Sequence, residues 1–216
     1  MYKRQPDARA LPKLQAIIDI DVAASAGWTA IDLARAYLNG GAQFLQLRAK
    51  TLPSAAFLDV CDAVVALARE AAALVLVNDR VDLAKLSGAS GVHVGQDDLP
   101  VTEARALLGE QAIVGFSTHS VAQVRLALAQ PSSYIAVGPV FGTRTKDTGY
   151  EAVGLQLVSE AARLCGGRPV VAIGGITLEN AASVIDAGAA CVAVIGDLLA
   201  GGKPETRVRA YRQVLQ

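Results

Sequence analysis

Short runs of apolar residues alternate with longer stretches in which apolar residues recur at helical spacing, and this pattern continues along most of the chain. Such runs are typical of buried strands, and the spaced stretches are typical of amphipathic helices. The expected strands are residues 14–20, 44–49, 74–77, 91–95, 113–116, 134–138, 170–173 and 191–195. The expected helices are residues 30–38, 54–72, 81–87, 102–108, 121–129, 155–164, 178–187 and 205–215, with Thr29 and Thr177 as N-caps for two of them.

Eight strands, each followed by a helix, predict a parallel sheet, and eight units is the number that closes a (β/α)8 TIM barrel. The rival is an open doubly wound sheet, but no G-x-G-x-x-G follows the first strand. The stretch GDLLAGGKP resembles a phosphate loop superficially, yet Pro204 stands where Ser or Thr is needed, so we expect a turn there. We therefore expect a single barrel domain over residues 14–216.

Residues 1–13 are expected to be an N-terminal extension. The first five, MYKRQ, match the translation of a sequencing adapter read from a GTG start, so they are excluded from the fold prediction. The chain has 216 residues, of which 52% are hydrophobic and 19% are charged, which suits one well-buried α/β core.

The formal net charge is zero, so no overall field points to nucleic acid or an anionic membrane. No apolar run approaches the length of a membrane span, and no signal peptide is visible, so a cytoplasmic location is expected. Cys61, Cys165 and Cys191 are odd in number and widely spaced, which indicates buried structural thiols and neither disulfides nor a zinc site.

Acidic residues follow two consecutive expected strands. The third strand runs into Asn78-Asp79, and the fourth into Gln96-Asp97-Asp98. The carboxyl ends of a parallel pair lie side by side, about 4.8 Å apart between strand axes. Two carboxylates that close repel unless a cation lies between them or one holds a proton. Oxygen ligands of this kind favour Mg²⁺, although ordinary loop aspartates are the alternative.

The second expected strand ends in QLRAK, in which Gln46, Arg48 and Lys50 share one side. Leu45 and Leu47 take the other side and are expected to face the helices, which turns the polar side chains to the barrel mouth. Arginine offers a fork and lysine a point charge to an anion. Two cations beside a magnesium site predict pyrophosphate binding; a solvated strand end is the alternative.

Further polar residues follow the fifth and sixth expected strands. Ser117 can hydrogen-bond a phosphate oxygen, and His119 is either an acid–base group or a packed loop histidine. The long loop after the sixth strand carries Thr143-Arg144-Thr145-Lys146, which can wrap an anion, and its length suggests a lid.

Glycines follow the seventh and eighth strands, as Gly174-Gly175 and Ile195-Gly196. Glycine lets backbone N–H groups approach a phosphate, and these two loops are the usual phosphate site of a barrel, although tight turns are the alternative. The mouth thus presents two predicted anion sites, suited to a diphosphate leaving group and a monophosphate co-substrate. The metal-assisted site comprises Arg48, Lys50, Asp79, Asp98 and Lys146, and the neutral site Thr143, Thr145, Gly175, Ile195 and Gly196.

Seven motifs then carry a family resemblance: QLRAK, VNDRVDLA, GVHVGQDDLP, VGFSTHS, VGPVFGTRTK, VAIGGI and VAVIGDLL. In order and spacing, from about residue 43 to 199, they resemble the thiamine-phosphate synthase (thiamine phosphate pyrophosphorylase) family. The resemblance implies that a pyrimidine methyl diphosphate ionises, that magnesium pyrophosphate leaves, and that the ring nitrogen of a thiazole phosphate captures the cation. It also implies Mg²⁺ as cofactor, two small-molecule substrates and a homodimer.

The same resemblance assigns roles to matching residues. Gln46 would hydrogen-bond the aminopyrimidine, and Asp79 with Asp98, the second acid of GQDD, would bind Mg²⁺. The pyrimidine diphosphate would contact Gln46, Leu47, Arg48, Ala49, Lys50, Asn78, Ser117 and Lys146, with Lys50, Ser117 and Lys146 catalytic. The thiazole phosphate would contact Thr143, Arg144, Thr145, Gly175, Ile195 and Gly196.

Two departures and two alternatives accompany this resemblance. The first strand is unlike the family's usual opening, and Gly196 replaces a common Ser, which removes a hydroxyl but keeps the backbone N–H. A thiazole tautomerase of the same fold would use His119 for proton transfer and needs no metal-diphosphate site. A non-catalytic phosphate-ligand sensor would leave Lys50, Asp79 and Asp98 idle.

Overall fold

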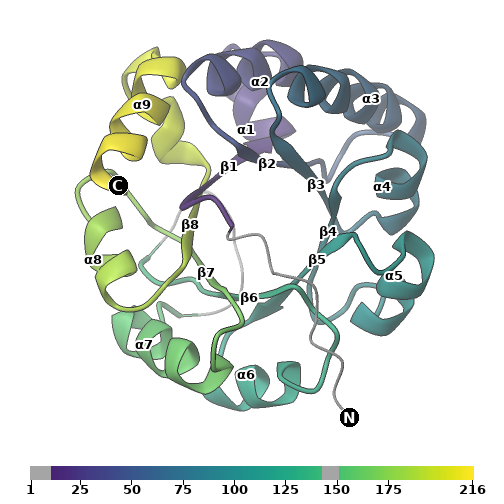
Figure 1. Ribbon diagram of the computed structural model, residues 1–216. Helices are drawn as coiled ribbons and strands as arrows, with labels where there is room; N and C mark the ends of the chain where they lie inside the picture. Colours follow the sequence, from purple (N-terminus) through teal and green to yellow (C-terminus); the bar gives the residue numbers. More distant parts are fainter. Residues whose placement is uncertain (1–10, 143–150) are drawn as a thin grey trace.

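Eight parallel strands form a closed barrel in sequence order, β1 to β8, and the helices surround it (Figure 1). This computed structural model describes residues 11–142 and 151–216. The strands are β1 Leu14–Asp19, β2 Phe44–Arg48, β3 Leu74–Asn78, β4 Gly91–Val94, β5 Ile113–Thr118, β6 Tyr134–Val137, β7 Val170–Ile173 and β8 Cys191–Val194. The helices are α1 Ile20–Ser25, α2 Ala30–Asn39, α3 Ser54–Glu70, α4 Val81–Ser87, α5 Val101–Leu108, α6 Val121–Ala127, α7 Gly154–Cys165, α8 Ala181–Asp186, the 3₁₀ helix η1 Gly196–Gly202 and α9 Pro204–Val214. The predicted barrel is confirmed, and the open-sheet alternative is wrong.

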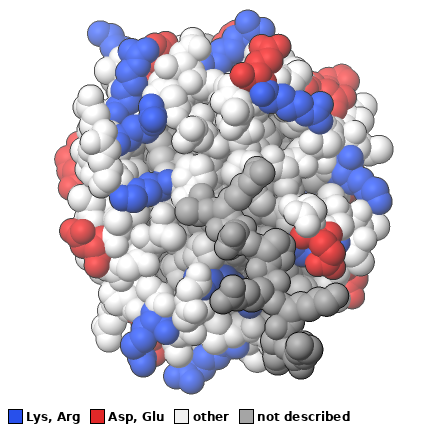
Figure 2. Space-filling model, in the orientation of Figure 1, with Lys and Arg blue, Asp and Glu red and all other residues white. Residues whose placement is uncertain are grey.

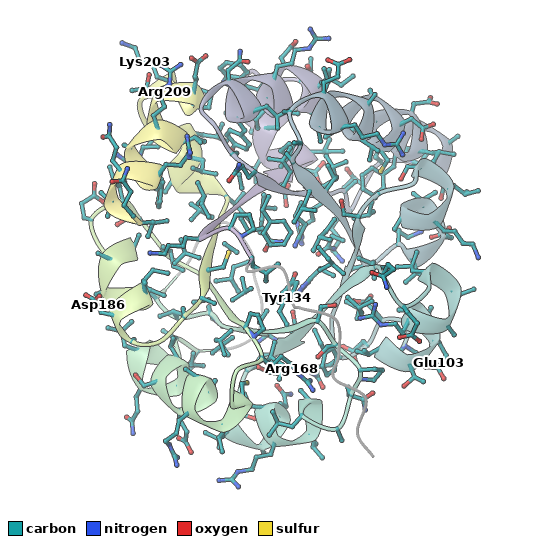
Figure 3. All side chains as sticks on the ribbon, in the orientation of Figure 1. Glu103, Tyr134, Arg168, Asp186, Lys203 and Arg209 are labelled. Carbon is teal, nitrogen blue, oxygen red and sulfur yellow. The ribbon has the colours of Figure 1, made fainter. Side chains whose placement is uncertain are left out.

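The barrel has two hydrophobic layers because alternate strand residues face opposite sides. The outer layer packs strands against helices and includes the fully buried Leu45 and Leu47. The inner layer fills the barrel below the mouth; it comprises Ile17, Phe44, Leu76, Tyr134, Ala136, Val171, Cys191 and Ala193. Tyr134 meets Phe44 edge to face, with ring centroids 6.4 Å apart, and Figure 3 shows Tyr134 inside the ring of strands. The outward-facing leucines therefore turn the polar residues of β2 inward, as predicted.

The register places the inward polar residues on neighbouring strands. Gln46 on β2 pairs in register with Ile17 and Leu76, and Asn78 on β3 pairs with His93 on β4. These positions lie at or near the carboxyl ends of their strands. The mouth is therefore assembled both from side chains on the strands and from the segments that follow β5 to β8.

Three local predictions are wrong. β1 ends at Asp19, whose carboxylate accepts a hydrogen bond from the N–H of Val22 at 3.2 Å and caps α1, where a loop was expected. Six residues with one buried side chain, Ala23, are too short to show a helical period. Thr177 is not a cap, because its N–H donates to Asn180 at 2.8 Å and α8 begins later, at residue 181. The expected turn at residues 196–202 is the 3₁₀ helix η1.

Other local predictions hold. Thr29 caps α2 by accepting from the N–H of Asp32 at 3.1 Å, while its hydroxyl donates back to the Asp32 carboxylate at 2.7 Å. The three cysteines are buried and unpaired, and burial raises the pKa of Cys61 to about 12. Along the described part of the chain, no helix combines the length and apolar character needed to span a membrane. Figure 2 shows positive and negative side chains interspersed around the rim of one face, in keeping with the zero net charge.

Candidate active site

A cavity of about 430 Å³ opens between the carboxyl ends of the strands and extends down into the barrel. Its volume lies in the range of small-molecule sites. Several of the residues predicted to bind substrates line this cavity. In the described part of the chain they are Gln46, Arg48, Asn78, Ser117, Gly175, Ile195 and Gly196. The fold therefore brings together residues that are up to 150 positions apart in the chain, counted from Gln46 to Gly196.

Some predicted residues are not in this wall. The Leu47 side chain is buried in the outer layer and Ala49 packs against it, so neither side chain lines the cavity. Only the backbone atoms of these two residues can therefore contact a substrate in the cavity. Thr143, Arg144, Thr145 and Lys146 lie outside the described residues.

Arg48 forms an ion pair with Asp19, its register partner at the end of β1. Both side chains are largely buried, and the Arg48 Nε–H has no hydrogen-bond partner among the residues that the structure describes. Asp19 was not predicted as a site residue; its only sequence signal is an acid at the end of an apolar run. The ion pair cancels much of the positive charge that the sequence of β2 predicts at the mouth. The Nε–H of Arg48 remains available as a hydrogen-bond donor beside the cavity.

Lys50 lies outside the cavity wall and pairs with Asp79, with 2.5 Å between Nζ and Oδ2. The Asp79 backbone has a φ of +62°, which is unusual for a residue other than glycine. The N–H of Arg80 donates to the carbonyl of Asn78 at 2.7 Å, so Asp79 is the central residue of a three-residue γ-turn. A positive φ at a residue other than glycine is strained, and such strain is typical of functional sites.

Asp98 lies close enough to Asp79 to share a proton with it. Its Oδ2 accepts from the N–H of Gly95 at 2.7 Å, whereas the neighbouring Asp97 is exposed. Burial acts to raise the pKa of Asp79, but hydrogen bonds with Lys50 and Asp98 outweigh it and hold that pKa low. Burial and the Asp79 carboxylate raise the pKa of Asp98.

A lowered pKa on one carboxyl group and a raised pKa on the other are typical of two facing carboxylates that share a proton. A divalent cation can take the place of that proton. Among the described residues, no group of three or more His, Cys, Asp or Glu side chains forms a metal site. Two carboxylates nevertheless fit Mg²⁺, which commonly takes one or two and completes its shell with water and substrate phosphate.

Two histidines lie in the cavity wall. His93, on β4, contacts Ser117 Oγ through Nε2 and the Tyr134 hydroxyl through Nδ1, both at 2.8 Å. It was not predicted, although its alternation with Val92 and Val94 could have shown that it faces inward. His119 lies 2.6 Å through Nδ1 from the carbonyl of Gly138. It is therefore held in the wall beside the loop that follows β6.

Glycines after β7 form a backbone cradle at the cavity. Gly174 and Gly175 have φ values of +104° and +61°, and a Cβ on Gly175 would lie 2.6 Å from the carbonyl oxygen of Gly142. The N–H groups of Gly174, Gly175 and Ile176 have no partner among the described residues. Unpaired N–H groups on a glycine turn form an anion-binding concavity. Gly175 of the predicted neutral anion site lies in this cradle, and anion binding there stays a prediction.

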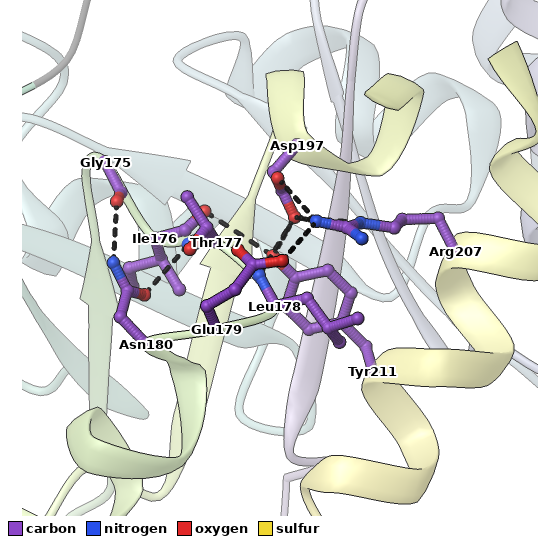
Figure 4. Close-up of polar contacts among 9 residues, drawn as sticks. All are labelled: Gly175, Ile176, Thr177, Leu178, Glu179, Asn180, Asp197, Arg207 and Tyr211. Carbon is purple, nitrogen blue, oxygen red and sulfur yellow. Dashed lines mark hydrogen bonds and ion pairs between the residues drawn. The ribbon is translucent and has the colours of Figure 1, made fainter. Parts of the chain in front are cut away.

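A polar cluster behind this cradle joins it to the segment after β8 (Figure 4). Asp197, in η1, accepts from the N–H of Leu178 at 3.1 Å, from Arg207 at 2.9 Å and from the Tyr211 hydroxyl at 2.5 Å. Asn180 donates to the carbonyl of Gly175 at 3.1 Å. Sequence patterns did not point to Asp197, because its partners come from a different loop and from α9. The cluster holds the two predicted phosphate loops at a set separation.

Fold and cavity together are those of a (β/α)8-barrel enzyme, whose site lies at the carboxyl ends of the strands. The sequence model of the family described as "Thiamine monophosphate synthase" matches residues 15–198. The chain belongs to this family.

Curated relatives agree with this membership. The thiamine-phosphate synthase of Anaeromyxobacter dehalogenans (strain 2CP-C) is 48% identical over 172 residues, which are 80% of this chain and 77% of that protein. The thiamine-phosphate synthase of Roseiflexus sp. (strain RS-1) is 42% identical over 85% of this chain and 78% of that protein.

Solved structures agree as well. The thiamine phosphate pyrophosphorylase from Pyrococcus furiosus superposes with a TM-score of 0.84 at 28% identity, over 94% of this chain and 95% of that one. A 3-hexulose-6-phosphate synthase shares the fold alone, with a TM-score of 0.69 at 18% identity over 95% of this chain and all of that one.

Proposed function

We propose that this chain is a magnesium-dependent thiamine-phosphate synthase. It joins 4-amino-2-methyl-5-(diphosphomethyl)pyrimidine to 4-methyl-5-(2-phosphoethyl)thiazole and releases pyrophosphate, or it uses the carboxylated thiazole and releases CO2 as well. The observation that supports this proposal is that one mouth carries two chemically different groups of residues, each suited to an anion. A carboxylate pair with Lys50 lies on the β2–β4 side, and an uncharged glycine cradle follows β7. Family membership supports the same reaction.

The reaction breaks the bond between the pyrimidine methylene carbon and the diphosphate oxygen, and the bonding electrons leave with the oxygen. The thiazole nitrogen then donates its lone pair to the methylene cation to form the new carbon–nitrogen bond. With the plain thiazole no proton or electron is left over, because the thiazole becomes the thiazolium of the product. With the carboxylated form the carboxyl group also leaves as CO2, and the ring carbon that carried it takes a proton from solvent. The protein's task is therefore to stabilise charge on the leaving group and to exclude water from the cation.

The residues of the β2–β4 side divide this task. Mg²⁺ held by Asp79 and Asp98 would neutralise charge on the diphosphate. Lys50 lies beside Asp79 and can turn to the leaving group, where negative charge grows in the transition state. Gln46 is buried at the cavity wall, and its amide can hydrogen-bond the aminopyrimidine. Lys146 is proposed as a further cation for the diphosphate.

The second substrate occupies the other side. The N–H groups of Gly174, Gly175 and Ile176 would hold the thiazole phosphate with dipoles and no fixed charge. Thr143 and Thr145 are proposed as hydroxyl donors to the same phosphate. The cradle follows β7 and the carboxylate pair with Lys50 lies on the β2–β4 side of the mouth, so the two phosphate groups would bind in separate places. The thiazole ring would then lie between them.

A coupled assay tests this function. With both substrates and Mg²⁺, thiamine phosphate and pyrophosphate should appear in equal amounts, and chelation of Mg²⁺ should stop both. Tautomerisation of the carboxylated thiazole without coupling, or ligand binding without turnover, would overturn the assignment. Neither the tautomerase nor the sensor alternative is supported, since the curated relatives compared above are synthases. A cytoplasmic homodimer is proposed from the resemblance, and light scattering of the purified chain tests the dimer.

A further inference from the structure

Three side chains form a hydrogen-bonded chain from the inside of the barrel to its mouth. Tyr134 is fully buried and stacks on His93, with ring centroids 5.7 Å apart and an interplanar angle of 20°. The Tyr134 hydroxyl lies 2.8 Å from His93 Nδ1, and His93 Nε2 lies 2.8 Å from Ser117 Oγ. Ser117 lines the cavity, so the chain ends where a substrate would lie.

The donors in this chain run in one direction. Burial raises the pKa of Tyr134, so its hydroxyl keeps its hydrogen. A buried hydroxyl hydrogen needs an acceptor. The Gln15 side chain also interacts with this hydroxyl, but it lowers the pKa of Tyr134 and therefore acts as a donor, so within residues 11–142 and 151–216 the acceptor is His93 Nδ1. If Nδ1 accepts, a neutral imidazole carries its hydrogen on Nε2. The Nε2–H then donates to Ser117 Oγ.

The direction matters for Ser117. Its oxygen accepts from His93, so its own hydrogen has to point elsewhere, and no described residue accepts it. Toward the cavity, that hydrogen meets an anionic oxygen favourably. With the opposite tautomer, Ser117 would donate to Nε2 and present a lone pair to the same oxygen, which is repulsive.

We propose that His93 is a positioning residue whose tautomer, set by Tyr134, makes the Ser117 hydroxyl a donor to the leaving diphosphate. This inference rests on the proposed function for the identity of the anion. A donor aimed at the leaving oxygen becomes more valuable as charge develops there. Loss of the chain should therefore lower kcat more than it raises KM.

The tautomer can be observed directly. The chain has two histidines, so ¹⁵N NMR of the imidazoles gives two sets of signals, which His119→Asn assigns. At about pH 8, above the ordinary imidazole pKa of roughly 6.5, His93 should carry its hydrogen on Nε2. His119 should show the opposite tautomer, because its Nδ1 faces a carbonyl oxygen, which can only accept. A hydrogen on His93 Nδ1 in the unmodified protein would overturn the proposal.

Binding of magnesium pyrophosphate, followed by calorimetry, tests the link to the anion without turnover. His93→Leu and Ser117→Ala should each weaken binding about 5- to 10-fold, the scale of one hydrogen bond to a charged group. The double variant should be little worse than either single one, because both remove the same donor. If the losses of affinity in the two single variants instead multiply in the double variant, His93 acts only on packing and the proposal is wrong.

Kinetics with both substrates complete the test. His93→Gln places an amide donor near the Nε2 position and should recover most of the kcat lost in His93→Leu. Tyr134→Phe keeps the ring but releases Nδ1, so kcat should fall and the two His93 tautomers should both appear by NMR. If His93→Leu does not fold, these two variants still decide the matter. If pyrophosphate binds as expected but no thiamine phosphate forms, the proposed function fails and the role of His93 in donor placement stands.

Discussion

The ammonium group of Lys50 lies 2.5 Å from the carboxylate of Asp79, the residue proposed to hold Mg²⁺. Lysine and metal therefore compete for the same oxygen. An exposed ion pair of this kind contributes about 0.2–1 kcal/mol, so the competition is weak enough for Mg²⁺ to win. The released lysine would then lie beside the diphosphate that the metal is proposed to bind.

Replacing Lys50 should separate metal affinity from catalysis. In Lys50→Met, Mg²⁺ should bind up to about 5-fold more tightly, because the competing cation is gone. Turnover should fall by about 10²–10³-fold, on the scale of one preorganised electrostatic contact. Calorimetry and steady-state kinetics measure the two effects. Lys85→Met, an exposed lysine on α4, is the matched control for loss of one positive charge, and weaker Mg²⁺ binding in Lys50→Met would contradict the competition.

Changes to the carboxylate pair should abolish turnover and leave the other anion site usable. Asp79→Asn and Asp98→Asn each remove a proposed metal ligand, so coupling should fall below detection while thiazole phosphate still binds. Asp97→Asn is the matched control, since Asp97 is exposed and adjacent to Asp98. If Asp97→Asn were the inactive variant, the assignment of the second acid would be wrong. Loss of thiazole phosphate binding in Asp79→Asn would instead argue against two separate sites.

The cradle after β7 should be sensitive to a single methyl group. Gly175→Ala introduces a Cβ 2.6 Å from a backbone oxygen at a φ of +61°, so the loop has to shift. The KM for the thiazole phosphate should rise at least about 10-fold, the scale of 1.4 kcal/mol. Gly201→Ala has a similar φ of +71° but nothing within 4 Å of the new Cβ. That control should cost about 1–2 kcal/mol of stability from backbone strain alone and leave the KM unchanged.

The Asp197 cluster should affect both stability and one substrate. Asp197→Asn weakens the bonds from Arg207 and Tyr211, so the free energy of unfolding should fall by about 1–3 kcal/mol. Because Asp197 also binds the N–H of Leu178, the KM for the thiazole phosphate should rise and that for the pyrimidine diphosphate should not. Glu205→Gln, which removes an exposed pair with Arg209, should change stability by at most about 0.5 kcal/mol. Equal effects on both substrates would show that the cluster does not act on the cradle alone.

Much of this protein follows from local sequence. The period-two alternation of β2 was enough to place Leu45 and Leu47 outside and Gln46 and Arg48 inside, because the side-chain period of a strand does not depend on its partners. The count of eight strand–helix units predicted closure, and parallel neighbours predicted that Asp79 and Asp98 would meet. The six-residue α1 was missed because a helix that short leaves no periodic signal.

Only the tertiary structure decided which groups pair with one another. Asp19 neutralises Arg48 across 29 positions of chain, and His93 reaches Tyr134 across 41. Asp197 was expected in a turn, yet it binds partners from the β7–α8 loop and from α9. The alternation of apolar and polar residues along the chain predicts which way each side chain faces. It does not state which opposite side chain comes within 3 Å, because that distance depends on the register of distant strands and on how the barrel closes.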